Sequence, residues 1–124
     1  MKTVLVIEDN RDNLRLITYV LRRSGYEVVS AETGEAGIEL AEQTLPAFVI
    51  VDIHLPGMDG TEVVRRIRGS AICGAIPVVA ITSHAMVGDR EKAIASGCNG
   101  YFEKPINPLT IMERIHGAIG MSPP

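Results

Sequence analysis

The sequence predicts a single-domain α/β protein in which a parallel five-stranded sheet is packed between two layers of helices. Three observations lead to this fold class. The chain has 124 residues, about the length of one domain with one hydrophobic core. Short apolar runs alternate along it with segments of helical periodicity. Several of these runs are apolar at consecutive positions, as in parallel strands that are covered on both faces.

Five segments have the composition of strands, because they are short, mostly β-branched or aromatic, and flanked by Gly, Pro, Asp or Ser. In chain order they are residues 3–7, 27–30, 48–51, 76–81 and 100–103. The first, third and fourth are continuously apolar rather than alternating. These three are therefore expected to be buried on both faces.

Four of the intervening segments repeat apolar residues at the i, i+3, i+4, i+7 spacing of a helix with one buried face. Gly25 and Gly97 follow the first and fourth helices where glycine ends helices, and Asp59 is placed to cap the third. The apolar faces comprise Leu14, Leu16, Ile17, Val20 and Leu21, then Ile38, Ala41 and Leu45, then Val63, Val64 and Ile67, and finally Ile111, Ile115, Ala118 and Ile119.

Five βα units joined by short connections form a doubly wound three-layer sandwich with right-handed crossovers. Two strand orders are compatible with this pattern. We predict the flavodoxin-like order 2-1-3-4-5, in which strands one and three are neighbours at the topological switch point. Ligands bind beyond the C-termini of the strands in such sheets, so the residues that follow the strands are the candidates for a functional site.

Composition disfavours several classes of function. The formal net charge is −3 and no run of Lys or Arg occurs, so direct binding to nucleic acid is not expected. The N-terminal apolar run has five residues, too few for a signal peptide or a membrane span, and a cytoplasmic protein without membrane contact is expected. Cys73 and Cys98 fit no metal or disulfide pattern and are expected to be reduced thiols.

Carboxylates follow two strands that the predicted order makes neighbours. Asp52 follows strand 48–51, and Glu8 and Asp9 follow strand 3–7, so all three reach one edge of the sheet. Carboxylates that converge repel one another and partly protonate unless a cation lies among them. Oxygen ligands without His or Cys suit Mg²⁺. The alternative, a solvated acid or helix cap, accounts for one such residue better than for three together.

Strands four and five are expected to add a hydroxyl and an ammonium group at the same edge. Thr82, followed by Ser83, ends the fourth strand, and Lys104 follows the fifth. With a metal-bound carboxylate, these groups form a site for a tetrahedral dianion such as phosphate. Taken singly, Thr82 would be an ordinary strand-end residue and Lys104 a solvated charge.

Among the chemistries that these groups could support, the sequence favours phosphoryl transfer onto a carboxylate, because the motifs of other nucleophiles are missing. The sequence has no GxSxG or GxxxxGK[ST] motif, and His54, His84 and His116 have no spacing typical of a catalytic triad or a zinc site. His116 lies near the end of the last helix, where a cation would favour the helix dipole. Asp52 is the predicted nucleophile because it lies deepest in an apolar strand, whereas the adjacent acids after the first strand suit metal binding.

Four segments resemble the receiver domain of two-component response regulators: VLVIEDN at 4–10, FVIVDIHLPGMDG at 48–60, IPVVAITSHAM at 76–86 and GYFEKPI at 100–106. The resemblance covers essentially the whole chain, with residues 1–121 as the receiver domain and 122–124 as a disordered tail. Within the family the sequence is most similar to stand-alone, single-domain receivers of the cell-division type, through Ala85, Met86, Gly88, Asp89, Gly97 and Cys98.

The resemblance implies a phosphoacceptor switch of a two-component or phosphorelay system. Asp52 would take a phosphoryl group from a phosphohistidine on a sensor histidine kinase or a histidine phosphotransfer protein, with Mg²⁺ as cofactor. The chain would catalyse only its own phosphorylation and dephosphorylation. The implied metal ligands are Glu8, Asp9, Asp52 and the backbone carbonyl of His54, and the implied catalytic residues are Asp52, Thr82 and Lys104.

The resemblance also implies a conformational switch made by Thr82 and Tyr101. Thr82 would move its hydroxyl to the phosphoryl oxygen, and Tyr101 would swing inward with it; otherwise Tyr101 is a half-exposed strand aromatic. A phosphoryl group adds close to two negative charges, enough to shift a balance of a few kcal/mol between two states. The bond between Lys104 and Pro105 would be cis, a state nearly confined to X-Pro.

The face formed by the fourth helix, the fifth strand and the fifth helix would then bind a downstream protein. Val87 and Ile94 share one side of the predicted fourth helix, while Met86 and Ala93 share another, so both sides carry apolar groups. We predict that Val87 and Ile94 are partly exposed, on a protein-binding or dimer surface of a monomer or weak homodimer. Ordinary core packing is the alternative.

Three other interpretations stay open at this point. The chain could be a receiver domain excised from a longer hybrid kinase or regulator. A haloacid-dehalogenase-like phosphatase would carry its second acid two residues after the nucleophile, where this chain has His54, and a cap domain for which there is no room. A receiver fold that no longer takes phosphate would not need the complete set of acids, hydroxyl and ammonium. The cognate kinase, the downstream process and the phosphate lifetime cannot be read from the sequence.

Overall fold

The computed structural model describes residues 2–124, which form five strands and five helices in strict alternation. All four strand pairs are parallel, and the sheet order is β2-β1-β3-β4-β5. The predicted fold class and strand order are therefore confirmed. The elements are β1 (Thr3–Ile7), α1 (Arg11–Arg23), β2 (Glu27–Ala31), α2 (Gly34–Thr44), β3 (Phe48–Val51), α3 (Gly60–Gly69), β4 (Val78–Thr82), α4 (Asp89–Ser96), β5 (Gly100–Glu103) and α5 (Ile111–Ile119).

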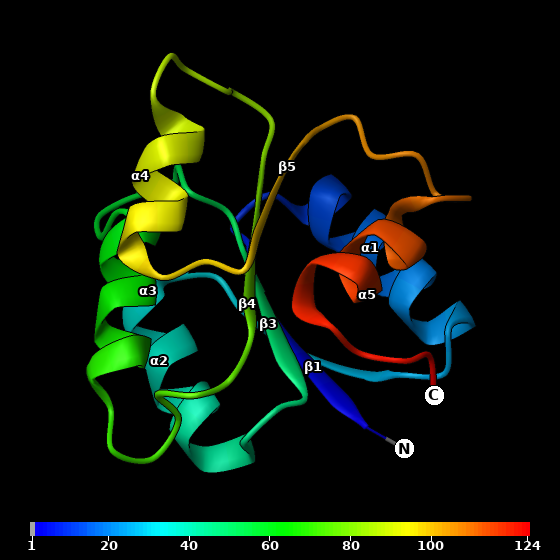
Figure 1. The fold of residues 1–124 in the computed structure, drawn as a ribbon, viewed down its shortest axis with the longest axis horizontal. Coiled ribbons are helices and arrows are strands. Elements are labelled where there is room, and N and C mark those ends of the chain that lie inside the picture. Colours follow the sequence, from blue (N-terminus) through cyan, green and yellow to red (C-terminus); the bar gives the residue numbers. More distant parts are fainter. Residues whose placement is uncertain (1) are drawn as a thin grey trace.

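The sheet separates two hydrophobic cores (Figure 1). Helices α1 and α5 cover one face, and α2, α3 and α4 cover the other. Within β1, Val4 and Val6 pack toward α1 and α5, whereas Leu5 and Ile7 pack toward α2 and α3. Successive side chains of a strand point to opposite faces, so a strand between two helical layers has to be apolar at every position. This explains the continuous apolar runs.

The helix ends follow the sequence signals. The Asp59 side chain accepts a hydrogen bond from the Thr61 N–H at 2.8 Å and caps α3, as predicted. The two predicted helix-ending glycines, Gly25 and Gly97, have φ angles of 95° and 117°, a left-handed conformation that other residues rarely adopt. The cap fixes where α3 begins, and the two glycines fix where α1 and α4 end.

Some predicted boundaries were wrong. Leu45 was placed on the buried face of the second helix, but α2 ends at Thr44, and Leu45 is its left-handed C-cap with a side chain that is 56% exposed. The fourth strand begins at Val78 rather than at residue 76. Just before β4, the Pro77 carbonyl accepts the Val49 N–H of β3 at 2.9 Å, whereas the Ile76 carbonyl accepts a hydrogen bond from the Arg68 guanidinium of α3.

Both cysteines are free and buried, as expected of structural thiols. Cys73 and Cys98 lie in the core under α2, α3 and α4. Burial raises the pKa of Cys98 to about 11, which keeps it protonated and unreactive at neutral pH. Among residues 2–124, no helix combines the length and the hydropathy that a bilayer crossing requires.

His116 is not the solvated, dipole-compensating cation that its place in the last helix suggested. It is 6% exposed, and its Nε2 lies 2.7 Å from the hydroxyl of Tyr26. The rings of Tyr26, Phe48 and His116 pack together at the N-terminal edge of the sheet, away from the strand ends that carry the acids. Burial lowers the pKa of His116, because an apolar surrounding disfavours the charged ring.

This buried histidine predicts a pH-dependent stability. The unfolded chain binds a proton at His116 below about pH 6.5, whereas the folded chain resists that proton, so the free energy of unfolding should fall as pH drops through this range. Urea unfolding between about pH 8 and pH 5.5 measures the slope. His116→Gln, which keeps a partner for Tyr26 but does not titrate, should have a shallower slope; equal slopes would contradict the prediction.

Candidate functional site

The register of the central strands brings the first acids together. β1 and β3 pair Ile7 with Val51, so the next residues, Glu8 and Asp52, leave the sheet side by side. The Asp52 N–H donates to the Ile7 carbonyl at 3.1 Å and extends the ladder by one bond. Both carboxylates are nearly buried, with Glu8 5% and Asp52 6% exposed. The loop after β1 adds Asp9, which is exposed.

These acids form a cluster with the donor set of a magnesium site. Glu8, Asp9 and Asp52 each offer a carboxylate oxygen, and the three oxygens lie within 4.8 Å of one another. Hard oxygen ligands with one open side suit Mg²⁺, which keeps several waters and binds a few carboxylates. The cluster therefore fits the predicted cation. The carbonyl of His54, the fourth predicted ligand, stays a prediction.

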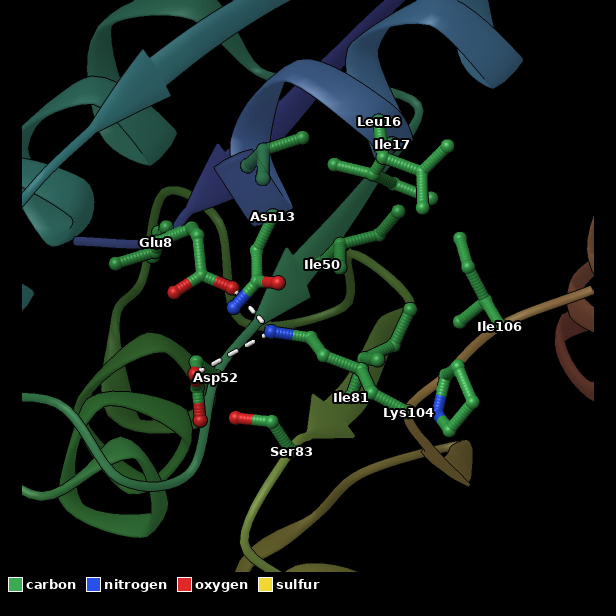
Figure 2. Close-up of a pocket in the computed structure, with 13 residues that line it drawn as sticks. Glu8, Asn13, Leu16, Ile17, Ile50, Asp52, Ile81, Ser83, Lys104 and Ile106 are labelled. Atoms are coloured by element: carbon green, nitrogen blue, oxygen red, sulfur yellow. Dashed lines mark hydrogen bonds and ion pairs between the residues drawn. The ribbon is translucent and has the colours of Figure 1, made fainter. Parts of the chain in front are cut away.

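Lys104 lies between the two buried carboxylates. Its Nζ is 2.5 Å from Oε1 of Glu8 and 3.5 Å from Oδ2 of Asp52, and the side chain is 14% exposed (Figure 2). The Lys104 N–H donates to the Thr82 carbonyl at 2.8 Å, which holds the residue at the end of β5 beside β4. The bond to Pro105 is cis, as the resemblance implied.

The charge balance of the cluster favours a further cation. Burial raises the pKa of Glu8 above its ordinary value, the Lys104 ammonium opposes this, and the neighbouring Asp52 carboxylate adds to it. One ammonium group thus does not fully compensate the two buried carboxylates. A divalent cation on the open side of the cluster would favour the ionised form of all its acids.

The two predicted switch residues are both buried. Thr82, the last residue of β4, is 1% exposed, and its Oγ1 accepts a hydrogen bond from the His84 N–H at 3.4 Å. Tyr101 is 6% exposed and belongs to the core under α4 with Ala93, so the half-exposed alternative is wrong. Burial raises the pKa of the Tyr101 hydroxyl, and the negative charge of the nearby Asp89 raises it further. The coupled movement of Thr82 and Tyr101 stays a prediction.

A cavity of about 290 Å³ opens beside Asp52 on the side of α1. Figure 2 shows the Ser83 hydroxyl pointing toward Asp52 and Lys104 at its polar end, and Ile17 and Ile106 on its apolar wall. Sequence reasoning missed this wall, because its residues come from α1, β1, β3, β4 and the β5–α5 loop. No local motif connects them.

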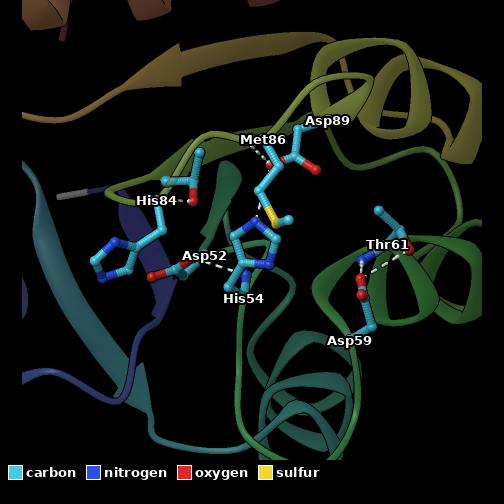
Figure 3. A network of polar contacts seen from close by, with 8 residues as sticks. Asp52, His54, Asp59, Thr61, His84, Met86 and Asp89 are labelled. Atoms are coloured by element: carbon cyan, nitrogen blue, oxygen red, sulfur yellow. Dashed lines mark hydrogen bonds and ion pairs between the residues drawn. The ribbon is translucent and has the colours of Figure 1, made fainter.

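His54 contacts the site in a way that the sequence did not suggest. Its backbone N–H donates to Oδ1 of Asp52 at 2.9 Å. Its ring Nε2 lies 2.9 Å from Oδ2 of Asp89, the first residue of α4 (Figure 3). The predicted fourth helix also started too early, since Met86 and Val87 lie in the loop before α4.

The exposed apolar residues near α4 agree with the predicted surface. Val87 is fully exposed, Met86 is 67% exposed and Ile94 is 46% exposed. On the opposite side of α4, Ala93 is buried against the sheet. Val87, in the loop before α4, and Ile94, on α4, are therefore exposed to solvent, as predicted; their use as an interface remains a proposal.

Comparisons with known proteins agree with this geometry. The model of the response regulator receiver domain family matches residues 4–116. The polar-differentiation response regulator DivK of Brucella ovis is 34% identical over 119 residues, which cover 96% of this chain and 97% of that protein. DivK of Brucella anthropi is 34% identical over the same length.

Solved structures show the same fold. The receiver domain of the sensor histidine kinase PA1611 from Pseudomonas aeruginosa PAO1, with a magnesium ion coordinated in its active-site cleft, has a TM-score of 0.86 at 31% identity over 96% of this chain and 98% of that one. The chemotaxis response regulator CheY4 of Vibrio cholerae has a TM-score of 0.86 at 25% identity, over 95% and 98% of the two chains. With the family model and the relatives in agreement with the site, this chain belongs to the receiver domains of two-component response regulators.

Proposed function

We propose that this receiver domain is a phosphoacceptor switch in which Asp52 takes a phosphoryl group from a phosphohistidine of a sensor histidine kinase or a histidine phosphotransfer protein. The observation that carries the proposal is the position of the Lys104 ammonium between Glu8 and Asp52, with Asp9 completing an acidic cluster at the same sheet edge. The chain modifies only itself and turns over no other substrate.

The transfer is an in-line displacement at phosphorus. A carboxylate oxygen of Asp52 forms the new P–O bond, and the P–N bond to the donor imidazole breaks with its electron pair going to the imidazole nitrogen. The His54 N–H holds Oδ1 of Asp52, while Oδ2 faces Lys104. Lys104 offsets negative charge on the phosphoryl oxygens. Mg²⁺ bound by Glu8, Asp9 and Asp52 would neutralise further charge on these oxygens.

The magnesium requirement has two supports. The three carboxylates supply an all-oxygen donor set, and the related Pseudomonas aeruginosa receiver domain coordinates magnesium in its active-site cleft. The His54 carbonyl is proposed as the additional ligand.

The cavity beside Asp52 is the proposed approach for the phosphodonor. It brings apolar residues of α1 and of the β5–α5 loop next to the acceptor carboxylate, so a donor helix could bury apolar surface while its phosphohistidine reaches Asp52. The solvent-exposed Val87 and Ile94 lie at α4, apart from this cavity, and are proposed to bind a downstream protein. Movement of Thr82 and Tyr101 would connect the two regions.

Mass spectrometry of the intact protein tests the proposal. After incubation with acetyl phosphate and Mg²⁺, the wild-type chain should gain the mass of one phosphoryl group, because this small donor transfers its phosphoryl group to a nucleophile without a partner protein, with acetate as the leaving group. With EDTA in place of Mg²⁺, the yield should fall by about tenfold or more. No gain of mass in either condition would favour a receiver fold that acts only through binding.

A further inference from the structure

We propose that His54 and Asp89 form a latch that holds the start of α4 in its resting position, and that this latch reports phosphorylation of Asp52 to α4. The proposal rests on the proposed function of Asp52. The latch adds a connection between Asp52 and α4 that does not involve Thr82 or Tyr101.

The latch is a continuous chain of hydrogen bonds (Figure 3). The His54 N–H donates to Oδ1 of Asp52 at 2.9 Å, the His54 ring Nε2 lies 2.9 Å from Oδ2 of Asp89, and that same oxygen accepts the Met86 N–H at 2.8 Å. Three contacts therefore join the acceptor carboxylate to the loop that opens α4. Val87, in that loop, is fully exposed on the proposed interface.

The chemistry of Asp89 sets the direction of these bonds. Asp89 is 5% exposed, and the Met86 N–H and the His54 ring both contact its Oδ2. An ionised carboxylate can only accept hydrogen bonds, so Nε2 of His54 carries the hydrogen. A buried acceptor that loses its donor is left with an uncompensated charge, which makes the two ends of the latch interdependent.

Phosphorylation would act on the first hydrogen bond of the latch, which the His54 N–H donates to Asp52. The carboxylate that holds the His54 N–H is the one that forms the acyl phosphate, and the new group brings oxygens that compete for the same donor. His54 is fixed at its backbone by Asp52 and at its ring by Asp89, so a shift at one end strains the other. Release of Asp89 would free the Met86 N–H and the first turn of α4.

The first test uses the protein without ligand. In hydrogen exchange, the Lys92 amide, which donates to Gly88 in the first turn of α4, should exchange about three- to tenfold faster in His54→Ala than in wild type. His54→Gln should restore the wild-type rate, because its amide nitrogen can still donate to Asp89. Unchanged exchange in His54→Ala would overturn the latch, since it would show that the first turn of α4 is held without His54.

The second test measures whether the latch biases the switch. Beryllofluoride, a stand-in for the phosphoryl group, is titrated with Mg²⁺ into each variant and followed by ¹⁹F NMR. A latch that holds the resting state lowers apparent affinity, so Asp89→Ala should bind about three- to tenfold more tightly than wild type. Asp59→Ala, which removes the side-chain cap of α3 and no link to His54, should bind as wild type does.

The double variant separates coupling from simple helix fraying. If His54 and Asp89 act as one device, His54→Ala/Asp89→Ala should bind beryllofluoride no more tightly than Asp89→Ala alone. Effects of the two substitutions that multiply would overturn the proposal. If wild type binds no beryllofluoride, the proposed function of Asp52 fails, whereas the exchange experiment still decides whether His54 and Asp89 hold α4.

Discussion

Asp52→Asn is expected to take up no phosphoryl group from acetyl phosphate under conditions in which the wild-type chain gains one. The amide has no anionic oxygen to attack phosphorus, and a loss of about 1,000-fold or more in rate is expected when a nucleophile is removed. The fold should persist, because the amide oxygen can still accept the His54 N–H that now binds Oδ1 of Asp52. Intact-mass measurement over time gives the rate.

The matched control is Asp59→Asn. Asp59 lies seven positions after Asp52 and caps α3 through its carboxylate, a role that asparagine performs equally well. This variant should be phosphorylated at the wild-type rate and unfold at the wild-type temperature. Wild-type phosphorylation of Asp52→Asn would mean that another residue is the acceptor, and loss of phosphorylation in Asp59→Asn would mean that the effect is not specific to Asp52.

Gly60→Ala is expected to destabilise the fold by about 3 kcal/mol or more. Gly60 is the first residue of α3, and a Cβ built on it lies 2.3 Å from the carbonyl oxygen of Asp52 and 2.6 Å from Cα of Ile53. Both obstacles are backbone atoms, which cannot rotate away as a flexible side chain can. The Gly60 N–H also donates to the Ile53 carbonyl at 2.7 Å, so α3 cannot retreat without breaking that bond. Urea unfolding measures the loss.

Gly69→Ala provides the comparison on the same helix. Gly69 ends α3, and a Cβ there meets no atom within 4 Å. Alanine should leave stability unchanged or raise it by about 0.5 kcal/mol, because glycine loses more backbone freedom on folding. Equal stabilities of the two variants would show that the backbone around Asp52 can move aside. If Gly60→Ala folds at low temperature, slower phosphorylation is expected, since the displaced backbone carries the acceptor.

The layers of this fold were predictable because a strand covered by helices on both faces must be apolar at consecutive positions, a pattern that is visible in the sequence. Strand β3 must meet α1 and α5 with one set of side chains and α2, α3 and α4 with the other, so Phe48–Val51 has no polar position. A general feature of parallel sheets then placed Glu8 and Asp52 together, because strand ends share an edge. In the structure the three acids and Lys104 do lie together at this edge, whereas the roles of these residues and of Thr82 stay predictions.

The errors have a different origin. Leu45 fits the helical spacing, but the chain leaves the helix in a left-handed conformation just there and exposes the side chain. His116 stands at a position favourable for a cation, yet Tyr26, 90 residues earlier in the chain, provides a hydrogen bond that lets it be buried. In both cases a single contact or dihedral overrode a pattern averaged over a helix.

The α/β class, the alternation of strands and helices and the positions of Glu8, Asp9 and Asp52 after two strands follow from the sequence alone, because hydrophobic patterning and strand ends are local properties. The tertiary structure decided which side chains meet across long separations: Lys104 between Glu8 and Asp52, and His54 against Asp89. Such contacts depend on ångström-scale positions of loops that begin on different strands. Spacing along the chain does not encode those positions, because each loop is placed by the packing of the whole core.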